Sequence, residues 1–422
     1  MKMKRAWNVF YFGILLVFMV SCAVFAGDNW PSLRGPSHDG ISDAAELPVE
    51  WSESENIRWK TAIHDQGWST PVIWDNQVWL TTATEDGHKL FAVCVDFNSG
   101  KIIHDKLIFE IDKPQRKHDQ NTYATPSPVI EAGRVYVHYG THGTACLDTG
   151  TGSILWTRED LHVNHIQGPA GSPFLYKNLL ILHLEGSEVQ FVIALDKNSG
   201  KTVWKTDRPQ EQYTKTIPLY RKGYSTPIIL NVEGDDQLIS VGAQMCHSYD
   251  PLTGEEIWSV YYGTDSTISS PVTDGELVFA ITGYQQPSPE LWAIRPTGMG
   301  DVTESHVVWK IKERVPIESS PIVKNGLIYM TNDNGRLSCV DAKTGEFVWQ
   351  GSLRGKFGAS PVFAGGRIYF SNKKGETTVI SEGKDFKVLS TNVLDEGFVA
   401  SPAIKDNSLI MRTKTHLYRI EN

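Results

Sequence analysis

The chain has 422 residues, and its 49 Asp and Glu against 40 Lys and Arg give it a formal charge of −9. Such an acidic balance argues against nucleic acid as the main partner, because phosphate binding needs a basic footprint. The length would ordinarily predict two or three domains, unless the chain is built of repeats.

The N-terminus predicts export. Lys2, Lys4 and Arg5 precede a long apolar run, which is the pattern of a signal peptide. Small residues before Gly27 predict cleavage there, so that residues 1–26 form the signal peptide. Loss of the three cations takes the charge from −9 to −12.

We therefore expect an exported protein in the periplasm or cell envelope. A lipid anchor at Cys22 and a retained membrane helix are the alternatives. Contact with a membrane is expected only if the N-terminus remains anchored. Residues 27–55 form a leader segment, and residues 56–422 carry a repeat.

The repeat begins with Ser-Pro or Thr-Pro followed by an apolar strand. The spacing between these steps, 40 to 57 residues, is typical of a four-stranded propeller blade. Eight steps predict an all-β, eight-bladed β-propeller of four-stranded antiparallel blades. The prolines are Pro71, Pro128, Pro173, Pro227, Pro271, Pro321, Pro361 and Pro402.

The last turn of several units has the form Asp-x-x-x-Gly, as in Asp341–Gly345, with a Trp four residues later. Asp can accept backbone N–H bonds across such a turn, and Gly supplies a positive φ. A large ring at a fixed position of the outer strand is expected to dock on the next blade. These structural tryptophans are Trp59, Trp156, Trp204, Trp258, Trp309 and Trp349; His104 stands in the corresponding place of one unit.

The eighth unit ends at Asn422 after three strands, and residues 56–63 form an apolar strand with no Pro step before it. The N-terminal strand 56–63 is therefore predicted to complete the last blade. Ring closure removes open strand edges. Four cysteines follow the leader, and three of them occupy equivalent strand positions in separate blades, too far apart for disulfides. We expect all four to be buried and reduced.

These motifs resemble the family of pyrroloquinoline-quinone-like (PQQ-like) β-propellers, over about residues 56 to 422. The family includes quinone-dependent alcohol and sugar dehydrogenases, outer-membrane assembly scaffolds and exported proteins without a known activity. The opening Asn29–Gly40 is similar to that of the last group. The resemblance implies pyrroloquinoline quinone with calcium as the cofactor of a member that is an enzyme. The adjacent cysteine pair of such enzymes does not occur in this sequence.

Candidate ligand-binding residues come from the connections between blades, which gather on one face of a propeller. Three consecutive connections, 106–124, 158–171 and 206–224, carry basic, histidine and aromatic residues, which suit an anionic or polyhydroxylated ligand. His162 and His165 lack a third fixed ligand, so no metal site is predicted. The candidates are Arg116, His118, Asn121, Tyr123, His162, His165, Lys215, Arg221, Tyr224, Arg314 and Glu318.

We interpret the chain as an extracytoplasmic binding or scaffold module, with its ligand at the channel face. A quinone-dependent alcohol or sugar dehydrogenase is the first alternative, and a polysaccharide-binding module is the second. The expected partner is a small anionic or polyhydroxylated ligand or a cell-envelope protein. No catalytic residue is assigned.

Overall fold

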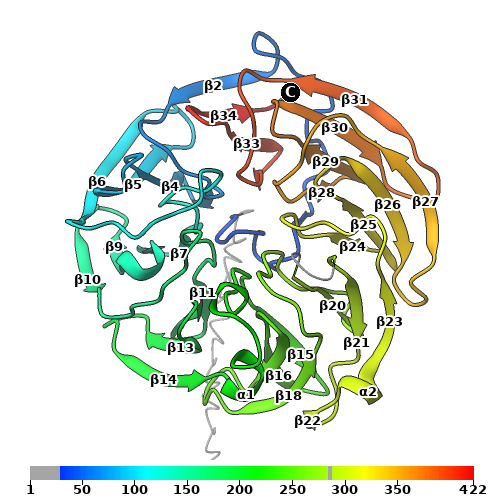
Figure 1. Cartoon of the computed structure of the whole chain (residues 1–422). Coiled ribbons are helices and arrows are strands. Elements are labelled where there is room, and N and C mark those ends of the chain that lie inside the picture. Colours follow the sequence, from blue (N-terminus) through cyan, green and yellow to red (C-terminus); the bar gives the residue numbers. More distant parts are fainter. Residues whose placement is uncertain (1–28, 284–287) are drawn as a thin grey trace, which may run out of the picture.

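The computed structural model describes residues 29–283 and 288–422, and the predicted signal peptide with Cys22 lies outside them. The described chain forms a ring of eight antiparallel sheets, so the predicted eight-bladed propeller is confirmed (Figure 1). Within these residues, no helix is long and apolar enough to cross a bilayer.

The first four blades follow one another along the chain, each with its innermost strand first. Blade 1 has β3–β6 (Val72–Trp74, Gln77–Ala83, Lys89–Asp96, Ile102–Glu110), blade 2 has β7–β10 (Val129–Glu131, Arg134–His138, Thr144–Asp148, Ile154–Arg158), blade 3 has β11–β14 (Phe174–Tyr176, Leu179–Glu185, Gln190–Asp196, Thr202–Asp207) and blade 4 has β15–β18 (Ile228–Val232, Asp235–Val241, Met245–Tyr249, Glu256–Tyr261).

The next three blades repeat this order. Blade 5 has β19–β21 and β23 (Val272–Thr273, Val278–Ile281, Leu291–Ile294, Val307–Ile311), blade 6 has β24–β27 (Ile322–Lys324, Leu327–Thr331, Arg336–Asp341, Phe347–Ser352) and blade 7 has β28–β31 (Val362–Ala364, Arg367–Ser371, Glu376–Ser381, Val388–Val393). An insertion in blade 5 adds β22 (Gly300–Asp301), parallel to β18, and the helix α2 (Thr303–His306).

The eighth blade closes the ring as predicted. It has β32–β34 (Ala403–Lys405, Ser408–Arg412, His416–Ile420), and its outer strand is the N-terminal β2 (Ile57–Ala62), antiparallel to β34. Figure 1 shows this blue strand beside the red end of the chain. The four cysteines of the described residues, Cys94, Cys146, Cys246 and Cys339, are buried and reduced, as expected.

The outer-strand tryptophans join neighbouring blades. Trp204, for example, donates from Nε1 to the carbonyl of Pro251 at 3.1 Å, in the Asp-x-x-x-Gly turn of the next blade. Trp59, Trp156 and Trp309 make the same bond to Phe97, Lys197 and Ala342. His104 takes the place of this Trp in blade 1, and its Nε2 lies 3.2 Å from the carbonyl oxygen of Thr149 in the next blade.

The leader segment crosses the middle of the ring, where it appears in dark blue (Figure 1). Trp30 exchanges two backbone hydrogen bonds with Ile73 of blade 1. The Arg34 side chain donates to the carbonyls of Ser320 and Pro321 on the far side of the ring, at 3.4 and 2.7 Å. The short strand β1 (Ile41–Ser42) then adds to β28 of blade 7. The leader thus spans one end of the channel, a role that the repeat pattern did not predict.

Candidate functional site

A cavity of about 350 Å³ lies at the centre of the ring. Every blade contributes to its wall, and the leader contributes Leu33. Its volume lies within the range of small-molecule binding sites. The residues that line the cavity are Leu33, Trp68, Thr70, His118, Gln120, Asn121, Thr125, Ser127, Gln167, Ala170, Ser172, Tyr224, Thr226, Ile268, Ser270, Glu318, Ser320, Gly358, Ser360, Val399 and Ser401.

Eight of these residues are the Ser or Thr of the eight repeated Ser/Thr-Pro steps. Proline fixes its own φ and keeps the preceding residue extended, so each step presents its hydroxyl in the same way. The eight hydroxyls form a ring around the cavity, which we call the hydroxyl ring. Its members are Thr70, Ser127, Ser172, Thr226, Ser270, Ser320, Ser360 and Ser401.

Hydrogen bonds connect the ring from blade to blade. The backbone N–H of Thr70 donates to Ser127 Oγ at 2.8 Å, and the N–H of Ser127 donates to Ser172 Oγ at 3.0 Å. Six such bonds run in the same direction, each from one blade to the hydroxyl of the next. From the sequence, the Ser/Thr-Pro steps predicted only where each blade begins. Their recurrence once in every blade was the signal that could have predicted a ring of hydroxyls around the channel.

Polar side chains at the cavity mouth hold the blade connections together. Asn121 donates from Nδ2 to the carbonyls of Gln167 and Pro169 at 2.8 and 3.1 Å. Tyr224 donates to the carbonyl of His165 at 2.8 Å. Trp68 is half-buried, and its Nε1 donates to the carbonyl of Gln120 at 3.2 Å. The mouth is therefore a fixed surface of amides and aromatic rings.

Glu318 is the one carboxylate among the described residues that line the cavity. Lys373 lies beside it, with Nζ at 2.9 and 2.7 Å from its two oxygens. Gly358 leaves the room for this pair, because a Cβ there would lie 2.3 Å from Glu318 Oε2. The ion pair leaves little net charge at the cavity wall.

Four of the candidates named from the sequence line the cavity, namely His118, Asn121, Tyr224 and Glu318. His165 and Tyr123 are buried behind the mouth. The remaining five candidates lie elsewhere. Arg116, His162 and Lys215 are exposed, Arg221 donates to the carbonyl of Thr216, and Arg314 donates to the carbonyls of Leu337 and Gly351.

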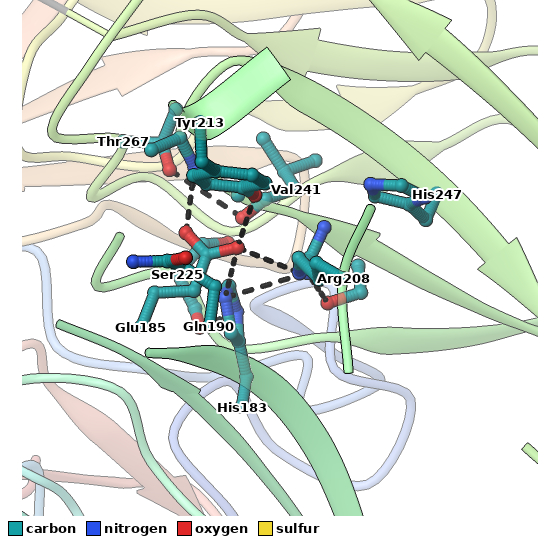
Figure 2. Close-up of polar contacts among 12 residues, drawn as sticks. His183, Glu185, Gln190, Arg208, Tyr213, Ser225, Val241, His247 and Thr267 are labelled. Carbon is teal, nitrogen blue, oxygen red and sulfur yellow. Dashed lines mark hydrogen bonds and ion pairs between the residues drawn. The ribbon is translucent and has the colours of Figure 1, made fainter. Parts of the chain in front are cut away.

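A buried ionic cluster anchors the connection between blades 3 and 4 (Figure 2). Glu185 Oε1 lies 2.6 Å from Arg208 Nε and accepts a hydrogen bond from the Tyr213 hydroxyl at 2.8 Å, while its Oε2 accepts from the N–H of Ala243. Tyr213 ends the helix α1 (Gln210–Tyr213) of that connection. Arg208, His183 and the N–H of Ala243 hold the pKa of Glu185 at about 2, against the opposing effect of burial.

This cluster explains why glycine occurs at two positions that the repeat does not account for. Gly223 and Gly242 both face the Glu185 carboxylate, and a Cβ at either would lie 2.3 or 2.2 Å from one of its oxygens. The cluster was not predicted, because Glu185, Arg208 and Tyr213 meet only in the folded ring. It fixes the connection that ends in Tyr224 at the cavity mouth.

The cavity does not fit pyrroloquinoline quinone with calcium. That cofactor is a polycarboxylate, whereas the described lining residues include no Arg or Lys. A calcium ion takes several oxygen ligands, often carboxylates. The single lining carboxylate is paired with Lys373, and the described residues include no group of three or more His, Cys, Asp or Glu placed to hold a metal.

Solved structures share this architecture at low sequence identity. BamB from Moraxella catarrhalis is 13% identical with a TM-score of 0.58, over 86% of this chain and 99% of that one. A quinohemoprotein alcohol dehydrogenase from Comamonas testosteroni is 12% identical with a TM-score of 0.66, over 93% of this chain and 80% of that one. A europium-containing methanol dehydrogenase is 13% identical with a TM-score of 0.56, over 92% and 90%. No curated protein sequence matches.

One family model matches most of the chain. Its description is outer membrane protein assembly factor BamB, and it matches residues 91–351, 301–389 and 333–421. These matches span blades 1 to 8, and the solved structures have the same fold. The chain therefore belongs to the BamB-like family of PQQ-like β-propellers.

Proposed function

We propose that this chain is an exported binding protein that holds a small polyhydroxylated ligand in its central channel. The observation that carries the proposal is the cavity itself, about 350 Å³ in volume and lined by hydroxyls, amides and two aromatic rings. Such a lining pairs with the hydroxyls of a sugar or polyol, while Trp68 and Tyr224 suit its apolar faces.

The location in the periplasm or cell envelope is part of the proposal. A basic N-terminus followed by an apolar run favours export, and the family description names an outer membrane assembly factor. A scaffold role toward an envelope protein would use the outer surface rather than the cavity. Binding in the channel is favoured here because the leader and all eight blades contribute to one site.

The test uses residues 27–422 with a panel of monosaccharides, disaccharides, polyols and sugar acids, measured by calorimetry. We expect saturable binding of at least one compound, and a thermal shift that grows with its concentration. His118→Ala should weaken that binding about threefold to tenfold, the range of one lost hydrogen bond. His162→Ala is the matched control, since His162 is an exposed histidine of the next connection and does not line the cavity.

Two results would overturn the proposal. Saturable binding of pyrroloquinoline quinone that depends on calcium, with dye reduction by an alcohol or sugar, would make the chain a dehydrogenase. Binding of long polysaccharides alone, unaffected by His118→Ala, would place the ligand on the outer surface.

A further inference from the structure

Each repeated step places a second residue on the channel, two positions before its hydroxyl. Trp68 precedes Thr70 in this way, and Ile268 precedes Ser270. All eight residues at this position line the cavity, and seven of them are half-buried. Alternate residues of an extended segment face the same side, which explains why both positions reach the channel. One residue of every blade therefore determines what the channel presents to a ligand at this level.

This level lies on the side of the hydroxyl ring that is away from the leader. The leader contacts the inner strands after their hydroxyls, at Ile73, Ile130 and Pro321. Residues before the hydroxyls are correspondingly farther from it. A ligand that enters opposite the leader therefore meets this level first.

Two apolar walls face one another here, because blades four apart lie on opposite sides of an eight-bladed ring. Trp68 at blade 1 lies opposite Ile268 at blade 5. Val399 at blade 8 lies opposite Tyr224 at blade 4. Val399 and Trp68, from neighbouring blades, form the first wall, and Tyr224 and Ile268 form the second.

The polar atoms of the two aromatic side chains already bind protein groups. Trp68 Nε1 donates to the carbonyl of Gln120 at 3.2 Å, and the Tyr224 hydroxyl donates to the carbonyl of His165 at 2.8 Å. The aromatic rings themselves are therefore what the walls offer to a ligand, and both walls suit a surface of C–H groups.

The two sides between the walls are polar. Thr125 at blade 2 lies opposite Glu318 at blade 6. The smallest residues of this level, Ala170 and Gly358, follow at blades 3 and 7. The Glu318 carboxylate lies beside Gly358, where an added Cβ would be 2.3 Å from Oε2. An ionised carboxylate has about four acceptor sites, and Lys373 occupies only part of them. Apolar and polar surfaces thus alternate around the channel.

We propose that the channel selects a six-membered sugar ring whose hydroxyls are all equatorial, such as β-D-glucopyranose. The hydroxyls of this ring radiate from its edge, and its two faces carry only C–H groups. The faces pack against the two walls, and the edge hydroxyls bind the polar sides. An axial hydroxyl would meet a wall and lose its hydrogen bond, which is costly for a buried polar group. This inference rests on the proposed function, because it names which polyhydroxylated ligand the cavity holds.

The first test compares D-glucose with D-mannose, D-allose and D-galactose by calorimetry on the wild-type protein. Each of the last three differs from glucose by one axial hydroxyl. We expect glucose to bind at least about tenfold more tightly than each of them, the effect of one hydroxyl left without a partner. Equal affinities, or tightest binding of an epimer, would overturn this inference and leave the proposed function standing. No binding of any sugar or polyol would overturn both.

The second test adds a hydroxyl to each wall with little change of shape, by Val399→Thr and Ile268→Thr. At least one variant should narrow the preference for glucose over an epimer, about threefold to tenfold, because the new hydroxyl can partner the axial one. Val388→Thr is the control, since Val388 is exposed on the outer strand of blade 7 and does not line the cavity. It should leave every ratio of affinities unchanged. Unchanged ratios in both wall variants, or an equal change in the control, would overturn the assignment of the walls.

Discussion

The indole ring of Trp309 lies against Gly345 of the next blade, and its Nε1 donates to the carbonyl of Ala342 at 3.1 Å. Gly345 has a φ of +76°, and a Cβ added to it would lie 2.8 Å from the indole. The same arrangement joins Trp59 to Gly100 in blade 1. The turn glycine therefore has two roles, since it allows the positive φ and gives the ring its contact surface.

Gly345→Ala should separate these two roles. Gly326, in a hairpin of the same blade, has a φ of +74° and nothing within 4 Å of an added Cβ, so it is the matched control. Gly326→Ala should lower the free energy of unfolding by about 1 kcal/mol, for the backbone conformation alone. Gly345→Ala should lower it by about 3 kcal/mol, because the indole must also move. Urea unfolding measures both changes in the free energy of unfolding. Equal losses would mean that the Trp309 indole moves aside at no cost in free energy.

Glu185→Gln should be strongly destabilising. The substitution removes the charge that compensates Arg208, and both side chains are fully buried. Breaking a buried pair by removing one partner costs about 3–5 kcal/mol. Glu211→Gln is the control, since Glu211 and Lys215 form an exposed pair one helical turn apart and its loss should cost at most about 0.5 kcal/mol. A loss for Glu185→Gln no larger than for the control would contradict a structural role of the cluster.

The repeat made the fold predictable. The Ser/Thr-Pro step and the Asp-x-x-x-Gly turn are local motifs whose residues contact the same neighbours in every blade. The closing strand could be predicted for a related reason. The eighth unit has only three strands, and residues 56–63 form a strand that belongs to no other unit. Even the exception followed the pattern, as His104 takes the place and the hydrogen bond of a docking tryptophan.

The site was less predictable, because its side chains are positioned by contacts between distant segments. Residue type and position in a connection drew attention to His118, Asn121 and Tyr224, which line the cavity. The same reasoning cannot show that the guanidinium groups of Arg221 and Arg314 donate to nearby backbone carbonyls. The leader is not part of the repeat, so its course across the channel left no periodic signal.

The buried histidines behind the mouth should make the protein sensitive to acid. His165 is 4% exposed, so its ring has little access to water. Burial, together with the nearby His142 and His183, lowers the pKa of His165 to about 4. Burial likewise lowers the pKa of His138 to about 3. These pKa values lie below that of an unfolded histidine, about 6.5. The contribution of the neutral histidines to the free energy of unfolding is therefore fully present above pH 6.5 and is lost as the pH falls toward 4.

His165→Leu should remove one part of this acid sensitivity. One histidine in this environment accounts for about 1.4 kcal/mol per pH unit below 6.5, so between pH 7 and 4.5 the wild type should lose about 2 kcal/mol more than the variant. Urea unfolding at the two pH values measures the difference, and exposed His162→Leu should behave as the wild type does. Equal losses in the wild type and His165→Leu would show that His165 takes up its proton without leaving its buried position. Because Tyr224 donates to the His165 carbonyl and lines the cavity, we expect ligand binding to weaken over the same pH range.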